Sequence, residues 1–276
     1  MIKFAGVVVL YNPTKKDLKN IDTYIDYLDK LYVIDNSNKK NNFNHKKIEY
    51  IFNGENLGVA KALNMGIEKA NKYKWLLTMD QDTKLNKNIF IEVTKAIEKY
   101  DTSKIGIITP WHNTKLSVNK PKEKVDYPLD VMTSGNFVNL EIAKKVGGFK
   151  EEFFIDGIDI EFCLRLRKNN YKIMRLNNIE IKHSLGDIKY HKFLGRDYMC
   201  TNHNYLRNYY MARNYRYIKE EYLDIAPEFC NTLVKFKGIL FKIIMFESDK
   251  YRKIRNIFRG IIDYKLRKKG KYRYKN

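Results

Sequence analysis

The chain has 276 residues, 44% of them apolar, and a formal net charge of +21. This length and composition are typical of one large folded domain, or of one domain with an appendage. The charge favours an anionic partner such as nucleic acid, an acidic membrane surface or a phosphorylated substrate. Three scattered cysteines, Cys163, Cys200 and Cys230, exclude a disulfide framework and a CxxC metal site, and they favour a reducing compartment.

The first 110 residues alternate between short β-rich runs and longer helical patterns. The N-terminus, MIKFAGVVVLYNP, is too short to span a bilayer and lacks a signal-cleavage pattern, so it is predicted to be a strand. The predicted strands are Phe4 to Leu10, Leu31 to Asp35, Ile48 to Phe52, Lys74 to Asp80 and Ile105 to Thr109, and the predicted helices are Lys15 to Lys30, Gly58 to Lys72 and Asn86 to Tyr100. This order predicts an α/β fold with a mostly parallel sheet and helices on both faces.

Polar residues follow several of these strands. They are Tyr11-Asn12-Pro13, Asp35-Asn36-Ser37, Asn53-Gly54-Glu55-Asn56 and Asp80-Gln81-Asp82. Because ligands of such sheets bind beyond the carboxyl ends of the strands, these residues are expected to converge on one ligand crevice.

The second half is less regular. A polar linker from Trp111 to Asp126 precedes the mixed segment PLDVMTSGNFVNLEIAKKVGGF, a helix from about Ile158 to Asn169, and two short strands around Ile173 and Ile179. Beyond Gly195 the pattern becomes helical and aromatic. No internal repeat is found.

The C-terminal region is strongly basic, with 15 Lys or Arg residues against four acidic ones between Glu228 and Asn276. Its apolar residues recur at spacings of three and four, among basic ones, as in an amphipathic helix. Such a helix either lies in a membrane interface or packs on the parent domain with its basic face in water. The apolar positions are Ile254, Ile257, Phe258, Ile261 and Ile262.

The stretch WLLTMDQDTKL places Asp80 and Asp82 directly after a buried strand. A polar turn alone would explain them, since Asp is common where strands end. Two carboxylates at this spacing can also hold Mg²⁺ or Mn²⁺, which prefer oxygen ligands and bridge to substrate phosphates. The pair alone is weak evidence for a metal site.

Seven ordered motifs decide between these interpretations. VVVLYNP, VIDNSN, NGENLGVAKALNMGI, WLLTMDQD, TSGNFV, GGFKEEFFIDGIDIEFCLRLRKNNY and IKHSLGD together resemble the inverting family 2 glycosyltransferases of the GT-A fold, over about residues 4 to 190. MDQD, FFIDGIDIEFCLR, HSLGD and LRNYYMARN most resemble rhamnosyltransferases that build bacterial cell-surface polysaccharides.

The resemblance implies a donor-binding role for several residues. Asp35 matches the position that reads the nucleobase, Asp80 and Asp82 match the ribose and metal ligands, and His183 lies where the family often carries a His near the metal. Asn56 and Gly58 match an Asn-x-Gly at a helix start that favours negative charge. Tyr11 and Asn12 are further nucleotide contacts. Structural alternatives are an Asx turn at Asp35, an ordinary helix start at Gly58 and a hydrogen-bonded structural His183.

The same resemblance implies a general base on FFIDGIDIEFCLRLR. Asp159 falls on the aspartate of the family's Glu-Asp motif, although Ile158 replaces the Glu, and Asp156 is the reserve candidate. A base must remove the acceptor hydroxyl's proton during inverting transfer. Asp159 could also serve simply as an acid that opens a helix.

The remaining candidates lie further along the chain. Ser134 and Gly135 of MTSGNF are expected beside the sugar or the acceptor. Arg207 and Arg213 of LRNYYMARN either bind a diphosphate or an acceptor phosphate, since Arg contacts phosphate in a bidentate manner, or contribute to packing of the helix. The tyrosines of this cluster are assigned to packing.

Together these features predict a metal-dependent inverting glycosyltransferase with Mn²⁺ or Mg²⁺. By the resemblance, the donor is dTDP-L-rhamnose and the acceptor a lipid-diphosphate-linked saccharide; a UDP-hexose or UDP-HexNAc donor is the alternative. Residues 1–195 would form the GT-A domain (1–110 the nucleotide-binding half, 111–195 the acceptor half), and 196–276 a helical, basic, membrane-associating extension. We expect a cytoplasmic protein, peripheral on the inner face of the plasma membrane; a homodimer stays open.

Three other functions fit the sequence less well. Nucleic-acid binding would explain the charge, but not the carboxylates at the crevice. A sugar nucleotidyltransferase would carry a Gly-rich basic loop after the first strand, where this chain has Leu10-Tyr11-Asn12-Pro13. A processive synthase would carry a Gln-x-x-Arg-Trp type motif and several membrane spans.

Overall fold

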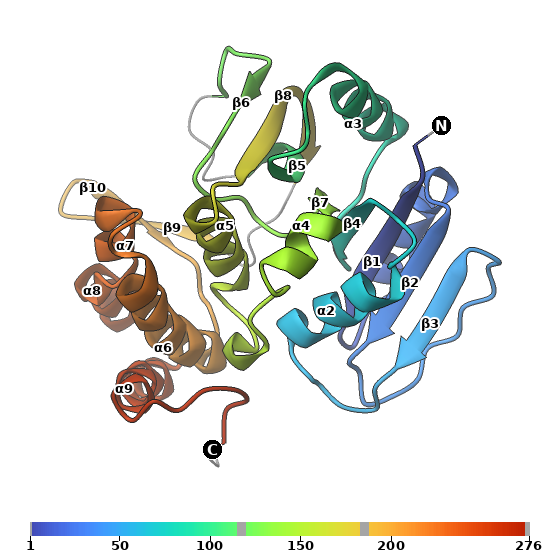
Figure 1. Cartoon of the computed structure of the whole chain (residues 1–276). Helices are drawn as coiled ribbons and strands as arrows, with labels where there is room; N and C mark the ends of the chain where they lie inside the picture. Colours follow the sequence, from blue (N-terminus) through green and yellow to red (C-terminus); the bar gives the residue numbers. More distant parts are fainter. Residues whose placement is uncertain (1, 115–119, 183–187, 274–276) are drawn as a thin grey trace.

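A computed structural model describes residues 2–114, 120–182 and 188–273. Its centre is an eight-stranded sheet in the order β3-β2-β1-β4-β7-β5-β8-β6 (Figure 1). The strands are β1 (Phe4–Leu10), β2 (Lys30–Asp35), β3 (Ile48–Phe52), β4 (Trp75–Asp80), β5 (Ile105–Asn113), β6 (Val125–Asp126), β7 (Asn136–Asn139) and β8 (Lys172–Lys182). Only β7 and β6 run antiparallel to their neighbours. The predicted α/β class with a mostly parallel sheet is confirmed.

Helices cover both faces of this sheet, as the continuous apolar strands require. Along β1, Ala5 and Val7 join the core under α2, whereas Phe4, Val8 and Leu10 join the core under α3, because successive side chains point to opposite faces. The α-helices between β1 and β8 are α1 (Lys15–Asn20), α2 (Val59–Lys69), α3 (Lys87–Lys99), α4 (Leu140–Lys145) and α5 (Ile158–Lys168).

The predicted helix from Lys15 to Lys30 is much shorter in the structure. It stops at Asn20, and the chain continues through two 3₁₀ turns, Ile21–Thr23 and Ile25–Tyr27, before β2 begins at Lys30. The segment after Asn20 is rich in Ile, Asp, Thr and Tyr, which are weak helix formers. Burial of Ile21, Tyr24 and Ile25 against the sheet holds these turns.

Two predictions about the middle of the chain are also corrected. The two short strands around Ile173 and Ile179 form one strand, β8, whose pairing with β5 shifts register between Pro110 and Trp111. This irregularity leaves residues 177–179 without partners on β5, so β8 continues across the expected break. The expected linker after Trp111 contributes to the sheet, since β5 continues to Asn113 and β6 adds an edge.

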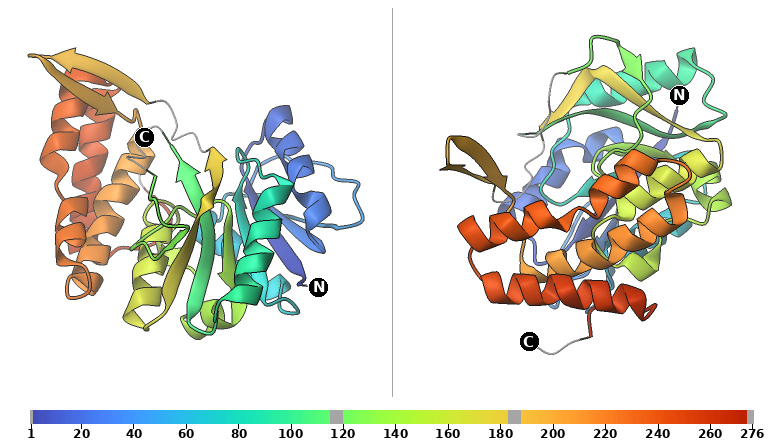
Figure 2. Two further views of the ribbon diagram at one scale, coloured as in Figure 1. Left: turned by 90° about the horizontal axis from the view of Figure 1, so that it is seen from above. Right: turned by 90° about the vertical axis from the view of Figure 1, so that its left-hand side faces the viewer.

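The C-terminal part contains a hairpin and a group of helices. The hairpin joins β9 (Lys189–Phe193) to β10 (Arg196–Cys200), and β10 lies where the sequence beyond Gly195 predicted a helical pattern. The helices are α6 (Tyr205–Tyr222), α7 (Pro227–Leu233), α8 (Phe236–Phe246) and α9 (Lys250–Lys265). Figure 2 shows them together on one side of the sheet, with the hairpin at their edge. Among the described residues, no helix combines the length and apolarity that a membrane span requires.

Helices α6 and α9 pack unusually closely. A Cβ atom on Gly260 would lie 2.4 Å from the carbonyl oxygen of Tyr209, so only glycine permits this approach. Ile257 on α9 is fully buried beside Ala212 of α6. The C-terminal helices predicted after the GT-A fold are therefore present, and within this group α9 packs against α6.

Candidate active site

The carboxyl ends of β1, β2 and β4 meet at one edge of the sheet. Leu10 pairs with Asp35 across β1 and β2, and Val9 pairs with Asp80 across β1 and β4. The polar residues that follow these strands are consequently neighbours. The convergence expected from the strand order is present in the structure.

The DQD loop is tied to the end of β1 by its middle residue. The backbone N–H of Tyr11 donates to Oε1 of Gln81 at 2.8 Å, and Nε2 of Gln81 donates back to the Tyr11 carbonyl at 3.4 Å. The Asp82 carboxylate is exposed and accepts a hydrogen bond from the Thr83 hydroxyl at 3.3 Å. Gln81, which the sequence analysis did not single out, thus positions the loop, and its place between the two aspartates is the signal that could have identified it.

Ser134 and Gly135 lie directly against Asp80. The Ser134 hydroxyl accepts a hydrogen bond from the Asp80 N–H at 3.0 Å, and the Gly135 N–H donates to the Thr78 carbonyl at 2.7 Å. Gly135 has φ +81°, and a Cβ atom there would lie 2.1 Å from Cδ1 of Ile181. Glycine is therefore required at position 135 by the fold, in addition to any clearance for a ligand.

A buried histidine supports this turn from behind. Nε2 of His112, near the end of β5, lies 2.7 Å from the carbonyl oxygen of Ser134. The side chain is 8% exposed. His112 was not predicted to be a site residue, because a single histidine in a strand has the same sequence signature as a structural histidine. Its contact makes it a positioning residue for the Ser134 turn.

Asp35 is fully buried, and its carboxylate accepts three hydrogen bonds. They come from the Ser37 N–H at 2.9 Å, Nδ2 of Asn41 at 2.7 Å and the Tyr50 hydroxyl at 2.7 Å. Burial alone would raise the pKa of Asp35, but these hydrogen bonds outweigh it and hold the pKa below its ordinary value. Asp35 is thus an ionised residue that organises residues 36–41, and in this structure its carboxylate is not open to solvent.

Gly58, which was predicted as a glycine at a helix start near the ligand, is also required because the loop at Phe154 passes close to it. Asn56 Oδ1 accepts the Gly58 N–H at 2.9 Å, which shapes the turn before α2. Gly58 has φ +89°, and a Cβ atom there would lie 2.8 Å from the Phe154 carbonyl oxygen. The Val59 N–H donates to this same oxygen at 2.8 Å. The start of α2 is therefore fastened to the loop that carries Asp156.

The loop before α5 has a strained backbone. Phe154, Asp156 and Gly157 have φ of +66°, +61° and +80°. Residues other than glycine rarely adopt such positive values. Such strain persists only where surrounding contacts hold it. Nδ2 of Asn214 on α6 supplies these contacts by lying 2.8–3.0 Å from the carbonyl oxygens of Phe153, Ile155 and Asp156.

Asp156 and Arg207, both predicted site residues, form an ion pair. Nε of Arg207 lies 3.0 and 3.2 Å from the two carboxylate oxygens of Asp156, whose side chain is 4% exposed. Burial raises the pKa of Asp156, although the Arg207 charge opposes this rise. The Arg207 side chain is 42% exposed, so part of it is accessible from solvent although its guanidinium is paired with Asp156.

Asp159 lies in the first turn of α5, close to two other acidic residues. Its carboxylate accepts the Ile160 N–H at 2.9 Å and is half-buried. Burial, followed by the charges of Asp130 and Asp156, raises the pKa of Asp159 to about 6. Asp130, which the sequence analysis missed, also has a raised pKa because of burial. Such shifts are typical of groups that exchange protons near neutral pH.

Asp159 also borders the sheet edge that carries the DQD loop. It lines a small cavity together with Thr133 and Asn136. These two residues flank the Ser134 turn that contacts Asp80. The structure thus places the predicted base and the predicted donor-binding loop on either side of one turn.

Two neighbouring charged residues have structural contacts instead. Glu161 is fully buried and is held by Arg165 at 2.8 and 2.9 Å. Arg213 is 1% exposed, and its guanidinium donates to the carbonyl oxygens of Gly270, Glu152 and Phe153. In place of the predicted diphosphate contact, Arg213 joins α6 to the strained loop and the C-terminal segment.

The predicted metal ligands are partly described. Asp80 and Asp82 lie at the sheet edge, whereas His183 lies outside the described residues. Within residues 2–114, 120–182 and 188–273, no three His, Cys, Asp or Glu side chains are grouped as a complete metal site. One or two carboxylates together with substrate phosphates are nevertheless a normal ligand set for Mg²⁺, so the DQD carboxylates fit a metal that arrives with a diphosphate.

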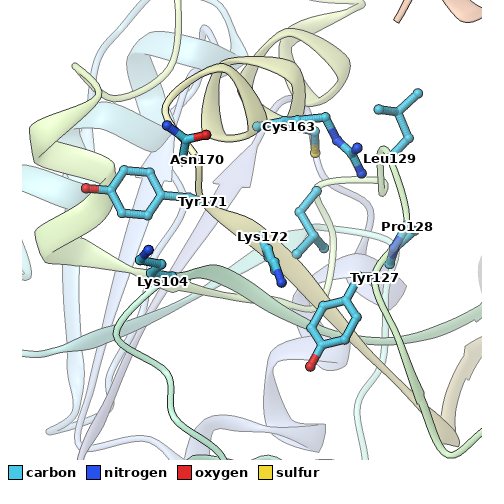
Figure 3. A pocket seen from close by; sticks show the side chains of 10 residues that line it. Lys104, Tyr127, Pro128, Leu129, Cys163, Asn170, Tyr171 and Lys172 are labelled. Carbon is cyan, nitrogen blue, oxygen red and sulfur yellow. The ribbon is translucent and has the colours of Figure 1, made fainter. Parts of the chain in front are cut away.

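A cavity of about 420 Å³ lies away from these carboxylates. It is formed near the starts of β5 and β8, at the opposite ends of these strands from the crevice, and Figure 3 shows Tyr127, Lys104 and Lys172 around it. Its wall also contains Cys163 of α5. Because none of the predicted site residues lines this cavity, its volume does not identify the active site.

Comparisons with known proteins agree with this geometry. The family model "Glycosyl transferase family 2" matches residues 23–190. The chain is 28% identical over 211 residues to the dTDP-rhamnosyl transferase RfbF of Shigella flexneri, covering 66% of this chain and 69% of RfbF. It is 22% identical over 213 residues to the low-salt glycan biosynthesis hexosyltransferase Agl10 of Haloferax volcanii, covering 67% and 68%.

Two solved structures share the fold. The S. aureus protein TarS (residues 1–349) superposes with a TM-score of 0.58 at 13% identity, covering 95% of this chain and 81% of that one. GalNAc-T7 with UDP, GalNAc and Mn²⁺ superposes with a TM-score of 0.55 at 15% identity, covering 71% of this chain and 44% of that one. Because the family model matches more than half of its length, the chain belongs to glycosyl transferase family 2 and is a glycosyltransferase of the GT-A fold.

Proposed function

We propose that this chain transfers L-rhamnose from dTDP-L-rhamnose, with inversion, to a lipid-diphosphate-linked saccharide. The likeness to a relative named as a dTDP-rhamnosyl transferase supports the donor. The observation that carries the reaction is Asp159, a half-buried carboxylate with a pKa raised to about 6, which lies beside the turn that contacts the DQD loop. A carboxylate in this position suits a general base at neutral pH.

The donor diphosphate would bind at the DQD loop. Asp82 is exposed and would ligate Mn²⁺ or Mg²⁺, with Asp80 as its partner on the same loop and as a ribose contact. A divalent ion held there would offset negative charge on the departing diphosphate. His183 stays a proposed third ligand. Gln81 and the Ser134 hydroxyl would hold this loop in place before the donor arrives.

The nucleoside would lie over the ends of β1 and β2. Tyr11 is 49% exposed, which makes its ring available for stacking on a base, and Asn12 is exposed beside it. Asp35 is buried in this structure and already accepts hydrogen bonds from Ser37, Asn41 and Tyr50, so residues 36–41 would have to move for its carboxylate to accept the imide N–H of the base. Asn56 and Gly58 would border the same site at the start of α2.

In the transfer step, Asp159 would take the proton of the acceptor hydroxyl as the hydroxyl oxygen forms a bond to the sugar's anomeric carbon. The bond from this carbon to the diphosphate breaks on the opposite face, and its electron pair leaves with dTDP. Asp156, paired with Arg207, would shape the acceptor pocket, and Gly135 would border the sugar. The exposed part of Arg207 would contact phosphate.

A uridine donor is the second candidate. A structure of the fold neighbour TarS is described as a complex with UDP-GlcNAc. Uracil and thymine present the same imide edge, so Asp35 does not separate them. A UDP-hexose or UDP-HexNAc would use the same fold and the same base.

We further propose that the protein works at the inner face of the plasma membrane, as a cytoplasmic, peripheral enzyme. Residues 1–195 would carry the chemistry and residues 196–276 the association. The basic C-terminal region supports this proposal, because anionic lipid attracts Lys and Arg near a membrane surface. A lipid-linked acceptor requires such a location.

The test combines calorimetry with transfer assays. The protein would be titrated with dTDP-L-rhamnose, UDP-glucose and UDP-N-acetylglucosamine, with and without Mn²⁺. We expect Asp82→Ala to weaken metal-dependent donor binding by roughly tenfold or more, because one of two protein ligands is lost. Asp159→Asn should retain donor binding and lose roughly 10²- to 10⁴-fold in transfer.

Asp224→Ala is the matched control, since Asp224 is an exposed aspartate beyond α6, away from the sheet edge. It should behave as the unmodified protein. Normal turnover by Asp159→Asn would remove its role as base. Preference for a uridine sugar would replace the proposed donor while keeping the mechanism.

A further inference from the structure

The exposed large apolar side chains of this protein are unevenly distributed. Fourteen such side chains occur among the described residues, and ten of them lie between residues 190 and 266. Surface apolar residues scattered singly are normal, but a concentration of them marks an interaction surface. The ten are Tyr190, Leu194, Leu223, Phe241, Ile244, Met245, Tyr251, Phe258, Ile262 and Leu266.

The most exposed of the ten lies at the tip of the β9–β10 hairpin. Leu194 is 86% exposed and has φ +49°, and the next residue, Gly195, has φ +73°. A two-residue hairpin turn with two positive φ values favours Asn-Gly, because Asn tolerates this backbone and leucine does so poorly. Leu194 is therefore unfavourable in two respects: its backbone adopts a conformation that leucine tolerates poorly, and its apolar side chain is exposed to water. Folding does not explain the leucine, whereas contact with an apolar phase does.

The hairpin and α8 form one continuous surface. The ring of Phe193 lies 6.3 Å from that of Phe241, and Tyr198 lies 5.3 Å from the same ring. Outward from these contacts, Phe241, Ile244 and Met245 are 37%, 52% and 39% exposed. Figure 2 shows the hairpin beside the C-terminal helices, at the side of the molecule remote from the N-terminal strands.

The charges around this surface are mainly positive. On the hairpin and α8, basic residues that are exposed or half-buried outnumber the one exposed acid, Asp197; the basic ones are Lys189, Lys192, Arg196, Lys237 and Lys242. The other acid at the end of α8, Glu247, is buried and holds Lys253 at 2.8 Å. Apolar side chains rimmed by basic ones match an anionic bilayer, in which acyl chains lie beneath negative headgroups.

We propose that the hairpin tip and the outer face of α8 dock into the interface of an anionic lipid bilayer. Leu194, Phe241, Ile244 and Met245 enter the acyl boundary, and the surrounding lysines and arginines contact the headgroups. This surface differs from the one expected from the sequence. Of the five apolar positions predicted on α9, Ile257 is fully buried in the cluster with α6 and α8, and Ile254 and Ile261 pack against it. Phe258 and Ile262 remain exposed, at 53% and 51%.

The inference deepens the proposed function, because it rests on a lipid-linked acceptor that has to be reached from the membrane. Helix α6 joins the two regions. Arg207 and Asn214 of α6 contact the Asp156 loop, and Ala212 of α6 lies in the apolar cluster that contains Phe236 of α8. Docking would thus place the acceptor side of the enzyme at a fixed height above the bilayer.

Vesicle co-sedimentation tests this surface. The full chain would be mixed with vesicles of phosphatidylcholine alone, or of phosphatidylcholine with phosphatidylglycerol. We expect binding to the anionic vesicles only, and Leu194→Asn should weaken it about tenfold, because one inserted leucine side chain is lost. Because Asn suits the turn, Leu194→Asn should fold at least as stably as the unmodified protein, as thermal unfolding would report.

Ile91→Asn is the matched control. Ile91 is 40% exposed on α3, on the sheet face opposite to α2, so its replacement should leave vesicle binding unchanged. Equal binding by Leu194→Asn and the unmodified protein, or no binding to anionic vesicles, would overturn the proposal. A dimer that Leu194→Asn dissociates, without vesicle binding, would also overturn it and assign the face to a second copy of the chain.

Donor titration separates this inference from the proposed function. Absence of nucleotide-sugar binding, together with intact vesicle binding, would reject the glycosyl-transfer proposal and leave the docking surface supported. Normal donor binding without vesicle binding would do the reverse.

Discussion

At the residue scale, burial of Asp159 changes the pKa of its carboxyl group and so its suitability as a base. Its pKa is raised first by burial and then by the negative charges of Asp130 and Asp156. The neutral form is therefore favoured more than in an ordinary aspartate, while the ionised form still dominates at pH 7. A base with a pKa near the working pH combines ionisation with proton affinity.

The pH dependence of transfer should report this group. We expect kcat/KM measured with a dTDP-L-rhamnose donor to rise with pH with a midpoint near 6, as Asp159 ionises. In Asp159→Asn this limb should be absent from the residual rate. A limb that persists in the variant would belong to another group.

Folding stability provides a control that is independent of activity. Because the folded pKa of Asp159 is raised, its contribution to stability is present below its ordinary value of 3.8 and is lost as pH rises through about 6. Asp159→Asn avoids this loss. It should be more stable than the unmodified protein by about 1–3 kcal/mol at neutral pH, and equally stable near pH 3, in denaturant unfolding.

At the scale of elements, the loop before α5 depends on contacts from two helices. Its three positive φ values are held by Asn214 from α6 and by the start of α2, where the Val59 N–H reaches the Phe154 carbonyl. The sequence motifs around Gly58 and Asp156 thus lie nearly 100 residues apart and form one unit.

Gly58→Ala tests this junction. The new Cβ atom would lie 2.8 Å from a carbonyl oxygen in a backbone of φ +89°, so we expect a loss of roughly 2–4 kcal/mol in stability, and weaker donor binding. Gly238→Ala is the control, because nothing lies within 4 Å of its Cβ position on α8. It should gain up to about 1 kcal/mol. Equal effects of both substitutions would contradict the assignment.

At the scale of the whole molecule, the 53 basic side chains have two roles. Part of this set is paired with acidic side chains, as in the Arg207–Asp156 and Arg165–Glu161 pairs, and adds nothing to the net charge of +21. A second part surrounds the apolar residues of α8 and the hairpin, where it faces solvent.

This charge predicts that the proposed membrane association is sensitive to salt. At about 1 M ionic strength the screening length falls to about 3 Å, so attraction between exposed basic residues and anionic lipid should largely disappear. We expect vesicle binding to drop by roughly tenfold or more between low and high salt, measured by co-sedimentation. Salt-independent binding would indicate that the charges around Leu194 do not contribute.

The sequence by itself determined the fold class and the polar strand ends. A run such as Trp75 to Met79 is apolar at every position, so it is buried on both faces, and Asp80 and Asp82 must then follow it at the sheet edge. These are local properties of the chain. The period of the apolar residues and the position of the polar ones were enough to place them.

Only the tertiary structure decided which of the polar residues are accessible to a ligand and which are used in contacts within the protein. Arg207 and Arg213 lie on the same helix, α6, and have the same side chain. Arg207 is partly exposed beside Asp156, whereas Arg213 is buried and donates to backbone carbonyl groups. The same holds for Leu194, which lies in a hairpin turn that the sequence did not predict. Such differences depend on contacts between distant segments, which neither propensity nor periodicity encodes.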